Sequence, residues 1–598
     1  KKRFEKAYGL IDLAHEIQYC REVLELVGVK ARDVPEPKRY SEAVEGRFSK
    51  FWTAAVQKEL ANLKNHKVYH WVMPKRGRKT VDAKWVFKAK SRNDGGIDKF
   101  KARLVARGFH QIYQVDYIET HAPVTVLTSF RACLAEAAKH SMGVAFFDIS
   151  GAYLEADLEE EVFLEPPPGV EPPEPGMVMQ LDKALYGLCQ AGRAWNRCLH
   201  KKLISLGFKC AEGVDHCLYT KDDKNGVIRL NAHVDDCCVT FTDRKLLTRL
   251  LDDLKLEGWG LSQSDDDNRF LGMEVEHLPG GAICLHQKGY IQEALEQFNM
   301  NACKASESPH DSGKKHTKDD CPQTAADIKA MTKIPYRSAI GKLRYLADGT
   351  RPDIATPLGM LSQFLCNPGR EHWEAVKKIF RYLKGTPTHG LIWGRETDGV
   401  PMVTCCTFSD ASWADDPDDR TSRLGYITYS WGGPIGWKSR KERNQALSST
   451  EAEYMAACLA ATEVVWTRRL FAHLGYDMEE LSMPSYGELT EAQYQGKYPS
   501  LIFDDNTGSI AMSKNPIKHS RNKHIQLKYH YVRQRVADGE VKLTYVPSEE
   551  NIADCLTKCL APKKFKYFRD KMVQDFDVKR YEAKMTENVK STGEKIKW

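Results

Sequence analysis

Residues 230–241 read LNAHVDDCCVTF and place two adjacent carboxylates, Asp235 and Asp236, inside an otherwise apolar, strand-like run. Burying both charges without a partner would cost free energy, because each would lose its water. A divalent cation removes that cost, since hard ions such as Mg²⁺ prefer carboxylate oxygens and share them with substrate phosphates. The pair predicts a metal-binding hairpin tip, although an ordinary aspartate-rich turn is the commoner explanation of such a pair alone.

A third carboxylate makes the metal site more specific. Asp148 lies in GVAFFDISGAYLEADLEE, directly after the apolar run 144–147. One aspartate at a strand end and a pair at a hairpin tip could hold two metal ions about 4 Å apart. Two ions at that spacing stabilise the attacking and leaving oxygens of a phosphoryl transfer, so the combination points to this chemistry.

Four further acids stand at element ends in the C-terminal part of the chain. Asp410 ends a β-like run, Glu451 lies in the first turn of a helical pattern, Asp505 follows an apolar strand, and Asp554 lies near a helix start. Acids that converge from strand ends and helix starts would suit a second two-metal site. However, Ser448-x-x-Glu451 is also a capping box, which needs no catalysis. Glu451 is therefore either a metal ligand or a helix cap.

The elements that position these acids include a basic hairpin. In residues 84–90, apolar residues alternate with lysines, and the alternation returns in residues 99–107 after the turn signal NDGG at 93–96. Period-two alternation predicts two strands with one apolar face and one basic face, joined by a tight turn. The basic face is either an ordinary solvated surface or a clamp for phosphates.

Composition limits the class of protein. The chain has 598 residues, of which 42% are hydrophobic, so several domains of about 150 residues are expected. The net charge of +7 is only weak support for a polyanionic partner. Seventeen cysteines without a C-x-x-C pair indicate reduced intracellular thiols instead of a disulfide framework. No run approaches the ~18 apolar residues that span a bilayer, so no membrane partner is expected. The chain shows no signal peptide and begins with Lys1, which suggests a part of something longer.

Ordered motifs carry a family resemblance from about Tyr40 to Lys558. VDAKWVFKAK, KARLVARGF, FFDISGAYL, KALYGLCQAGRAWN, HVDD, FLGMEVE and PYRSAIGKLRYLADGTRPDIA resemble, in this order, the reverse transcriptases of Ty1/copia-type LTR retrotransposons. TFSDASWADDPDDR, ALSSTEAEYMA, DDNTGSIA, KHSRNKHIQLKYHYVR and YVPSEENIADCLTK are similar to the RNase H domain that follows this polymerase. The resemblance implies a multidomain α+β fold: a right-hand polymerase with fingers, palm and thumb, then an RNase H-like domain with a mixed sheet.

The sequence divides into six expected regions. They are an N-terminal helix and linker (1–40), the reverse transcriptase (41–310), a polar linker (311–332), a connection region (333–398), the RNase H domain (399–560) and a basic C-terminal tail (561–598). The helix of the first region is expected over residues 10–27, where apolar residues recur at three- and four-residue spacing.

The resemblance also assigns site residues. It implies that Asp148, Asp235 and Asp236 bind the polymerase metals, and that Asp410, Glu451, Asp505 and Asp554 bind those of the nuclease. Two Mg²⁺ ions per active site are expected, with Mn²⁺ as the alternative. The expected nucleotide-binding residues are Lys88, Lys101 and Arg103 as triphosphate clamps, Tyr153 as a gate against the ribose 2′-hydroxyl, and Gln190 and Arg193 as supports for nucleotide and template. Tyr153 could instead be a core aromatic, and Gln190 and Arg193 could serve as helix caps or surface residues.

Three departures from the family pattern keep alternatives open. His233 stands where the family has Tyr, Cys189 and Gly192 replace Lys and Pro, and Glu155-Ala156 replaces a His-Gly pair. The expected function is an RNA-directed DNA polymerase with RNase H activity. The alternatives are a catalytically decayed nucleic-acid-binding relic and a hybrid-specific ribonuclease with an inactive polymerase.

The resemblance finally implies partners and a location. The partners are an RNA template, a DNA or RNA primer, dNTPs and the RNA/DNA hybrid, together with integrase and other parts of the parent polyprotein. We expect the chain inside the cell, in cytoplasmic particles, with the nucleus as an alternative.

Overall fold

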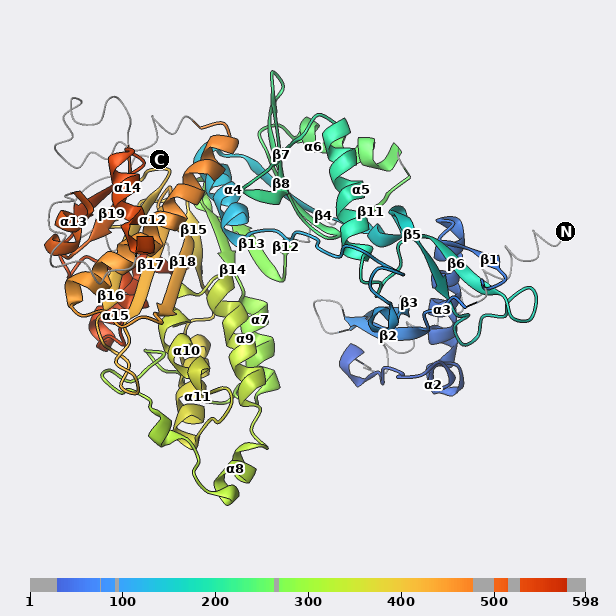
Figure 1. Ribbon diagram of the computed structural model, residues 1–598, viewed down its shortest axis with the longest axis horizontal. Coiled ribbons are helices and arrows are strands. Elements are labelled where there is room, and N and C mark those ends of the chain that lie inside the picture. The colour runs from blue at the N-terminus through green and yellow to red at the C-terminus, as the bar shows by residue number, and fades with distance from the viewer. Residues whose placement is uncertain are drawn as a thin grey trace. The chain divides into compact units, whose positions relative to one another are not determined.

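The computed structural model in Figure 1 describes residues 30–75, 77–91, 96–256, 258–262, 268–476, 499–514 and 527–577. The predicted helix over 10–27, most of the turn at 93–96 and the end of the predicted tail, 578–598, lie outside these ranges. The chain folds into two compact units. Unit 1 comprises Lys1–Val124, Ile149–Phe208 and Asp253–Ser262, and unit 2 comprises Thr125–Asp148, Lys209–Asp252 and Gln263–Trp598.

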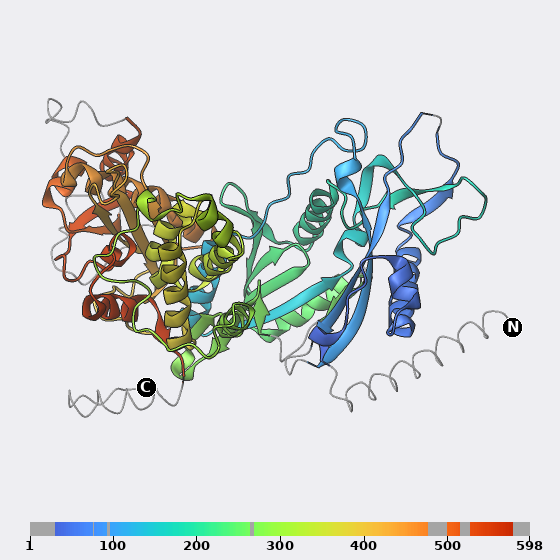
Figure 2. The same cartoon turned by 90° about the horizontal axis from the view of Figure 1, so that it is seen from below.

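Unit 1 contains the predicted basic hairpin. Strand β2 (Ala83–Ser91) pairs antiparallel with β3 (Ile97–Ala106), and helix α3 (Ser49–Asn65) packs on them, as both views show (Figures 1 and 2). The Trp52 ring of α3 meets Phe87 and Phe100 at centroid distances of 5.4 and 4.7 Å. The lysines of β2 are exposed. The predicted alternation of an apolar and a basic face is thereby confirmed.

The rest of unit 1 consists of small elements around a three-stranded antiparallel sheet. Its strand order is β1-β6-β5, and helix α5 lies downstream in the chain. The bounds are α2 Tyr40–Glu45, β1 Tyr69–Val72, the 3₁₀ turns η2 Gly108–His110 and η3 Ala152–Glu155, β5 Asp157–Leu164, β6 Val178–Lys183, α5 Ala191–Ser205 and β11 Gly260–Ser262.

Unit 2 begins with an antiparallel sheet in the order β4-β10-β9-β8-β7. Helix α4 covers one face, where Phe130, Cys133 and Leu134 pack with Phe146 and Cys238 of the sheet. An antiparallel sheet backed by helices is the expected palm. The bounds are α4 Leu127–His140, β4 Gly143–Ser150, β7 Lys209–Ala211, β8 Asp215–Asp223, β9 Gly226–His233, β10 Asp236–Phe241 and α6 Arg244–Leu256.

A second sheet and a group of helices follow in unit 2. The sheet has the order β12-β13-β14-β15-β21, and helices α9, α10 and α11 pack against one another. The bounds are β12 Arg269–Phe270, β13 Met273–His277, β14 Ile283–His286, α7 Lys288–Gln297, α8 Ala325–Met331, α9 Tyr336–Gly349, α10 Ala355–Leu361, α11 Arg370–Gly385, β15 His389–Trp393 and β21 Gln574–Asp575.

A buried ion pair lies inside this helical group. The Arg351 guanidinium donates to both carboxylate oxygens of Asp353, at 3.0 and 2.7 Å, and both side chains are fully buried. The Tyr382 hydroxyl donates to the same carboxylate at 2.5 Å, and Thr386 accepts from Arg351. Each charge of such a pair depends on its partner, because a buried charge left unpaired strongly destabilises the fold.

The last part of unit 2 is the mixed sheet expected of an RNase H-like domain. Its order is β18-β17-β16-β19-β20, with β16, β19 and β20 parallel and the other pairs antiparallel. The bounds are β16 Cys406–Ser412, β17 Arg423–Ser430, β18 Gly433–Lys441, α12 Ser449–His473, β19 Ser500–Asp504, α13 Thr507–Lys514, α14 Tyr531–Ala537, β20 Val541–Tyr545, η10 Ile552–Leu556 and α15 Pro562–Met572.

One hydrophobic core runs through unit 2 from the palm to this mixed sheet. It joins Phe130 of α4, Leu343 of α9 and Phe408 of β16. Arg131 of α4 adds a buried polar contact, because its guanidinium donates to the carbonyl oxygens of Ile435 and Gly349 at 3.0 and 2.8 Å. The palm and the mixed sheet therefore share their interior.

Candidate active sites

The first site lies on the β9–β10 hairpin of the palm. Asp236, the first residue of β10, stands directly opposite Asp148 of β4 in the strand register. Asp235 belongs to the two-residue turn before it, together with Val234 at φ 59°. A β-branched residue in the left-handed region is strained, and such strain is found mainly at functional sites. The structure thus brings the three predicted aspartates to one place.

The buried thiol of Cys237 lies within the electrostatic influence of all three aspartates. Burial raises its pKa well above the ordinary value, and the charges of Asp236, Asp148 and Asp235 raise it further. A carboxylate oxygen of Asp236 also accepts from the Leu271 amide at 3.2 Å. All three aspartates are partly exposed. They present negative charge at a surface accessible to a substrate.

The predicted triphosphate clamps lie in unit 1 on the basic hairpin. Lys101 stands opposite Lys88 in the strand register, and Lys88 makes an ion pair with Glu36 at 3.2 Å. The Arg103 guanidinium lies 4.5 Å over the ring of Tyr186, and the Tyr153 ring meets the same ring edge-on at 5.2 Å. Arg103 and Tyr153 therefore share one aromatic neighbour.

Gln190 and Arg193, the predicted supports for nucleotide and template, also lie in unit 1, where both contact the segment 111–119. Gln190 is 2% exposed; its amide nitrogen donates to the Asp116 carbonyl at 2.8 Å, and its amide oxygen accepts from Gln111 at 3.1 Å. Arg193 makes an ion pair with Glu119. These contacts hold the segment 111–119 in place.

The second site lies in the mixed sheet of unit 2. Carboxylate oxygens of Asp410, Glu453 and Asp505 all lie within 4.8 Å of one another. Asp410 is fully buried in β16, and Asp505 directly follows β19, which runs parallel beside β16. Oε2 of Glu453 is buried without a hydrogen-bond partner. A buried, unpartnered carboxylate oxygen beside two other carboxylates suits a divalent cation.

Burial and mutual repulsion shift the pKa values in this site. Burial raises the pKa of Asp410 to about 6, while Lys558 lowers it and Asp554 raises it. Burial, followed by the charges of Asp410, Asp504 and Asp505, raises the pKa of Glu453 well above its ordinary value. Groups that resist ionisation in this way gain most from a cation.

Comparisons with known proteins identify a matching family and several relatives. Residues 66–312 match the family described as "Reverse transcriptase (RNA-dependent DNA polymerase)". The chain is 35% identical over 541 residues to the Pol polyprotein from transposon TNT 1-94 of Nicotiana tabacum, covering 90% of this chain and 39% of that protein. It is 34% identical to the Pol polyprotein from transposon RE2 of Arabidopsis thaliana, covering 87% of this chain and 34% of that protein.

A shorter relative is matched over its whole length. The chain is 31% identical over 320 residues to a transposon Ty5-1 protein of Saccharomyces cerevisiae, covering 53% of this chain and 100% of that protein. The chain belongs to the Ty1/copia-type retrotransposon Pol family. It spans between a third and two fifths of the length of the two plant polyproteins.

The structure places Glu453, and not the predicted Glu451, in the second carboxylate group of this Pol chain. The Glu451 amide donates to Ser448 Oγ at 3.1 Å, and the Glu451 carboxylate accepts from the Leu447 amide at 2.7 Å. These are the contacts of a capping residue. Glu453 lies two residues further along α12, and its carboxylate lies beside that of Asp410 in β16. The sequence alone does not show whether Glu451 or Glu453 lies on the face of the helix that meets the sheet.

Asp554 stands at the edge of the second site with two lysines. Its carboxylate accepts from Lys558 and Lys564 at 2.6 and 2.5 Å, and Lys558 also lies 3.4 Å from Asp410. Sequence reasoning missed both lysines. Asp504 does not join the three close carboxylates, because it accepts from the Ser509 hydroxyl at 2.9 Å and the Asn506 amide at 2.8 Å.

The departures from the family pattern are accommodated locally. Burial lowers the pKa of His233, with Asp235 partly offsetting the effect. The Cys189 amide donates to Gln111 at 2.8 Å, and its thiol lies 3.2 Å from the Gly108 carbonyl. A Cβ at Gly192 would lie 3.2 Å from the Cβ of Ala122, so a larger residue there needs a small adjustment.

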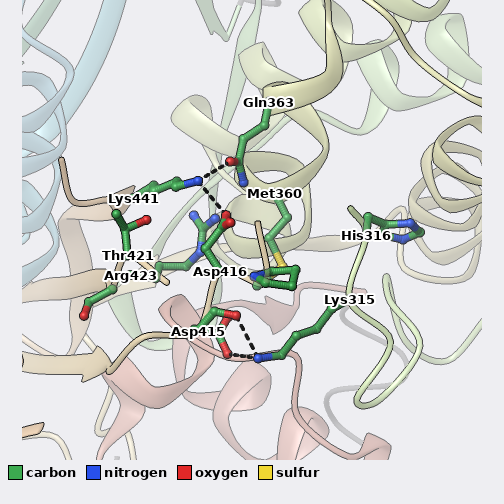
Figure 3. A pocket seen from close by; sticks show the side chains of 11 residues that line it. Lys315, His316, Met360, Gln363, Asp415, Asp416, Thr421, Arg423 and Lys441 are labelled. Carbon is green, nitrogen blue, oxygen red and sulfur yellow. Dashed lines mark hydrogen bonds and ion pairs between the residues drawn. The ribbon is translucent and has the colours of Figure 1, made fainter. Parts of the chain in front are cut away.

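The carboxylates of the two candidate sites are not among the residues that line the pocket of unit 2 in Figure 3. Lys315 makes an ion pair with Asp415 at 2.8 Å, and Lys441 makes one with Asp416 at 2.7 Å. The predicted linker and the acidic segment DDPDDR (415–420) thus meet through the Lys315–Asp415 pair. The predicted linker therefore contacts the rest of unit 2, to which it belongs.

One other group of possible ligands, His316, Asp320 and His372, has a structural explanation. The Gly369 amide donates to Nδ1 of His372 at 2.9 Å, which places the proton of the neutral ring on Nε2. His372 is therefore a cap at the start of α11, because a metal at Nε2 would require the opposite tautomer. Within the described residues, no helix is long and apolar enough to cross a membrane.

Proposed function

We propose that this Pol chain is an RNA-directed DNA polymerase with RNase H activity. It copies retrotransposon RNA into DNA by two-metal nucleotidyl transfer and degrades the RNA of the resulting hybrid. The observation that carries the proposal is the register of β4 and β10, which sets Asp148 against Asp236 beside a strained turn that holds Asp235. The close group of Asp410, Glu453 and Asp505 supports the nuclease.

Carboxylate oxygens suit divalent cations at both candidate sites, and those of Asp410, Glu453 and Asp505 lie within 4.8 Å of one another. Asp148, Asp235 and Asp236 would hold them in the palm, and Asp410, Glu453 and Asp505 would hold them in the mixed sheet, with Mg²⁺ as the expected ion and Mn²⁺ as the alternative. The ions would promote deprotonation of the attacking oxygen and neutralise charge on the phosphate in transfer. Hard oxygen donors without sulfur or imidazole favour these ions.

The chain's own residues would orient the reactants. In the polymerase, the basic hairpin would hold the triphosphate through Lys101 and Arg103, because fixed cations stabilise charge that develops on a transferring group. Tyr153, supported edge-on by Tyr186, would exclude a ribose 2′-hydroxyl. Positioning of the primer 3′-hydroxyl against the α-phosphorus supplies the rest of the rate.

The proposed partners are an RNA template, a DNA or RNA primer, dNTPs and the RNA/DNA hybrid, with integrase and other parts of a parent polyprotein. Backbone contacts should dominate nucleic-acid binding, so its affinity should fall steeply with salt. We place the activity inside the cell in cytoplasmic particles, with the nucleus as the alternative.

The test is Mg²⁺-dependent dTTP incorporation on poly(rA)/oligo(dT), with hybrid cleavage measured in parallel. Wild type should incorporate dTTP, and Asp235→Asn should not, while both cleave the hybrid. Cleavage without incorporation by the wild type would leave only a hybrid-specific ribonuclease. Absence of both activities would leave a nucleic-acid-binding relic.

A further inference from the structure

The segment after β3 in unit 1 turns its apolar side chains outward and its polar side chains inward. Phe109 is 77% exposed, Ile118 is 61% exposed and Tyr113 is 58% exposed. Ile112 and Val115, between them, are 39% and 44% exposed. Large apolar residues gain free energy when they leave water, so a contiguous exposed group of them marks an interaction site.

The inward polar residues hold this segment in one shape. Asp116 is 3% exposed and accepts from the Ile112 amide at 2.8 Å, and Gln111 is 8% exposed and donates to Gln190. Gln190 in turn donates to the Asp116 carbonyl. Arg78 donates to the Val115 carbonyl at 3.0 Å. The backbone of the segment is tied to the interior by buried hydrogen bonds, and the exposed rings are therefore preorganised.

The close approach of the chain at Gly108 supports the same conclusion. A Cβ at this position would lie 2.2 Å from the Gly187 carbonyl oxygen, so only glycine allows the segment to pack so tightly. Phe109 follows directly, and its ring meets His110 edge-on at 4.3 Å. The exposed Phe109 ring is therefore attached to a tightly packed backbone.

Positively charged residues on β3 precede this segment in the chain. Lys99, Lys101 and Arg103 alternate along β3 on the face opposite the buried Ala102 and Leu104. The acids of the segment itself are already engaged, since Asp116 is buried and Glu119 pairs with Arg193. Cations on a strand that is followed in the chain by exposed aromatic rings are the combination that binds single-stranded nucleic acid through its phosphates and bases.

We propose that Phe109 and Tyr113, with the apolar residues between and beside them, form a stacking platform for the single-stranded template beyond the primer duplex. The inference rests on the proposed polymerase function. It gives Gln190 and Arg193 a positioning role, because they hold the platform that touches the template. A single strand has exposed base faces to stack on these rings, whereas a duplex keeps its bases stacked on one another.

The test compares the affinity of the full chain for a blunt DNA duplex and for the same duplex with a single-stranded template overhang of about six nucleotides. All-DNA probes without dNTPs avoid both cleavage and extension, and fluorescence anisotropy reports binding. Wild type should bind the overhang duplex at least about tenfold more tightly. The double variant Phe109→Ala/Tyr113→Ala should lose most of that ratio while its affinity for the blunt duplex stays unchanged.

Matched variants separate stacking from other effects. Met73→Ala removes an apolar side chain of unit 1 that is 59% exposed and lies outside the platform, and it should keep the full ratio. Phe109→Leu keeps an apolar side chain without a ring and should lose part of the ratio. The lost factor should persist at high salt, because stacking releases no counterions whereas phosphate contacts do.

Several results would overturn the platform. These are a wild-type chain that binds both duplexes equally or neither, and a double variant that keeps the wild-type ratio. A double variant that keeps the ratio but alters the oligomeric state on size exclusion would assign the rings to a protein contact. A chain that shows the overhang effect and its loss, yet incorporates no dTTP, would refute the polymerase proposal and leave the platform intact.

Discussion

The structure assigns Glu453, and not Glu451, to the second site, and changing each acid separately tests this assignment. Glu453→Gln should abolish hybrid cleavage, whereas Glu451→Gln should preserve it. Glu453 contributes one of three carboxylates within 4.8 Å of one another, and glutamine removes its charge with little change in shape. Glutamine at position 451 can still accept from the Leu447 amide, since either Glu or Gln serves in a capping box.

The expected losses of cleavage activity differ by more than about 30-fold between the two variants. Loss of a residue that only orients a metal ligand costs about 10- to 100-fold in activity, so loss of a ligand itself should cost more than about 100-fold. Glu451→Gln should change the cleavage rate by less than about threefold, and Glu451→Ala, which loses the cap, should lower stability by about 1 kcal/mol. Glu453→Gln should raise stability at neutral pH without metal, because the Glu453 carboxyl ionises freely in the unfolded state, whereas burial and the charges of Asp410, Asp504 and Asp505 oppose its ionisation in the folded state.

The assay measures single-turnover cleavage of a labelled RNA/DNA hybrid, with thermal unfolding measured on the same samples in EDTA. dTTP incorporation by each variant shows that the palm remains folded. The reasoning is refuted if Glu451→Gln loses cleavage and Glu453→Gln keeps it. It is also refuted if Glu453→Gln unfolds at a lower temperature than wild type, since the repulsion argument requires the opposite sign.

Three further predictions concern stability and selectivity. Arg351→Met should destabilise unit 2 by about 3–5 kcal/mol in urea unfolding, because Asp353 would remain buried and unpaired, and adding Asp353→Leu should recover much of the loss; an unchanged midpoint for Arg351→Met would contradict this. Burial and the neighbouring His316 lower the pKa of His372 to about 4, so only the unfolded state takes up this proton between about pH 6.5 and pH 4, and stability falls as the pH drops. Between pH 7 and pH 5, wild type and the exposed control His277→Gln should each lose about 2 kcal/mol more than His372→Gln, and equal losses would refute the assignment. Tyr153→Ala should raise ribonucleotide incorporation relative to dTTP incorporation by about tenfold or more, and an unchanged ratio would return Tyr153 to a purely structural role.

Local patterns in the sequence were sufficient for the main elements. Alternation in residues 84–90 and 99–107 predicted the β2–β3 hairpin, because the period of two is set by the strand itself. The adjacent Asp235 and Asp236 predicted a hairpin tip, and the register supplies Asp148 opposite. A resemblance spread over many motifs predicted the order of the palm and the mixed sheet.

Features that depend on tertiary contacts were beyond the sequence. The helix pattern after Ser448 contains Glu451 and Glu453, and only the packing of α12 on β16 shows which one faces Asp410. Exposure of Phe109 contradicts the general tendency of aromatic residues to be buried, so composition alone could not reveal the platform. The contact between the predicted linker and the acidic turn needs two segments about 100 residues apart.

The common interior of the palm and the mixed sheet has an evolutionary consequence. Recombination exchanges protein segments most easily where each segment keeps a separate core. In this chain, Phe130 and Phe408 belong to one core, and Arg131 ties α4 to the carbonyl of Ile435. A crossover between related elements that falls between residues 148 and 405 would join two halves selected in different backgrounds. We expect the halves to be inherited together, with substitutions on one side of the interface compensated on the other.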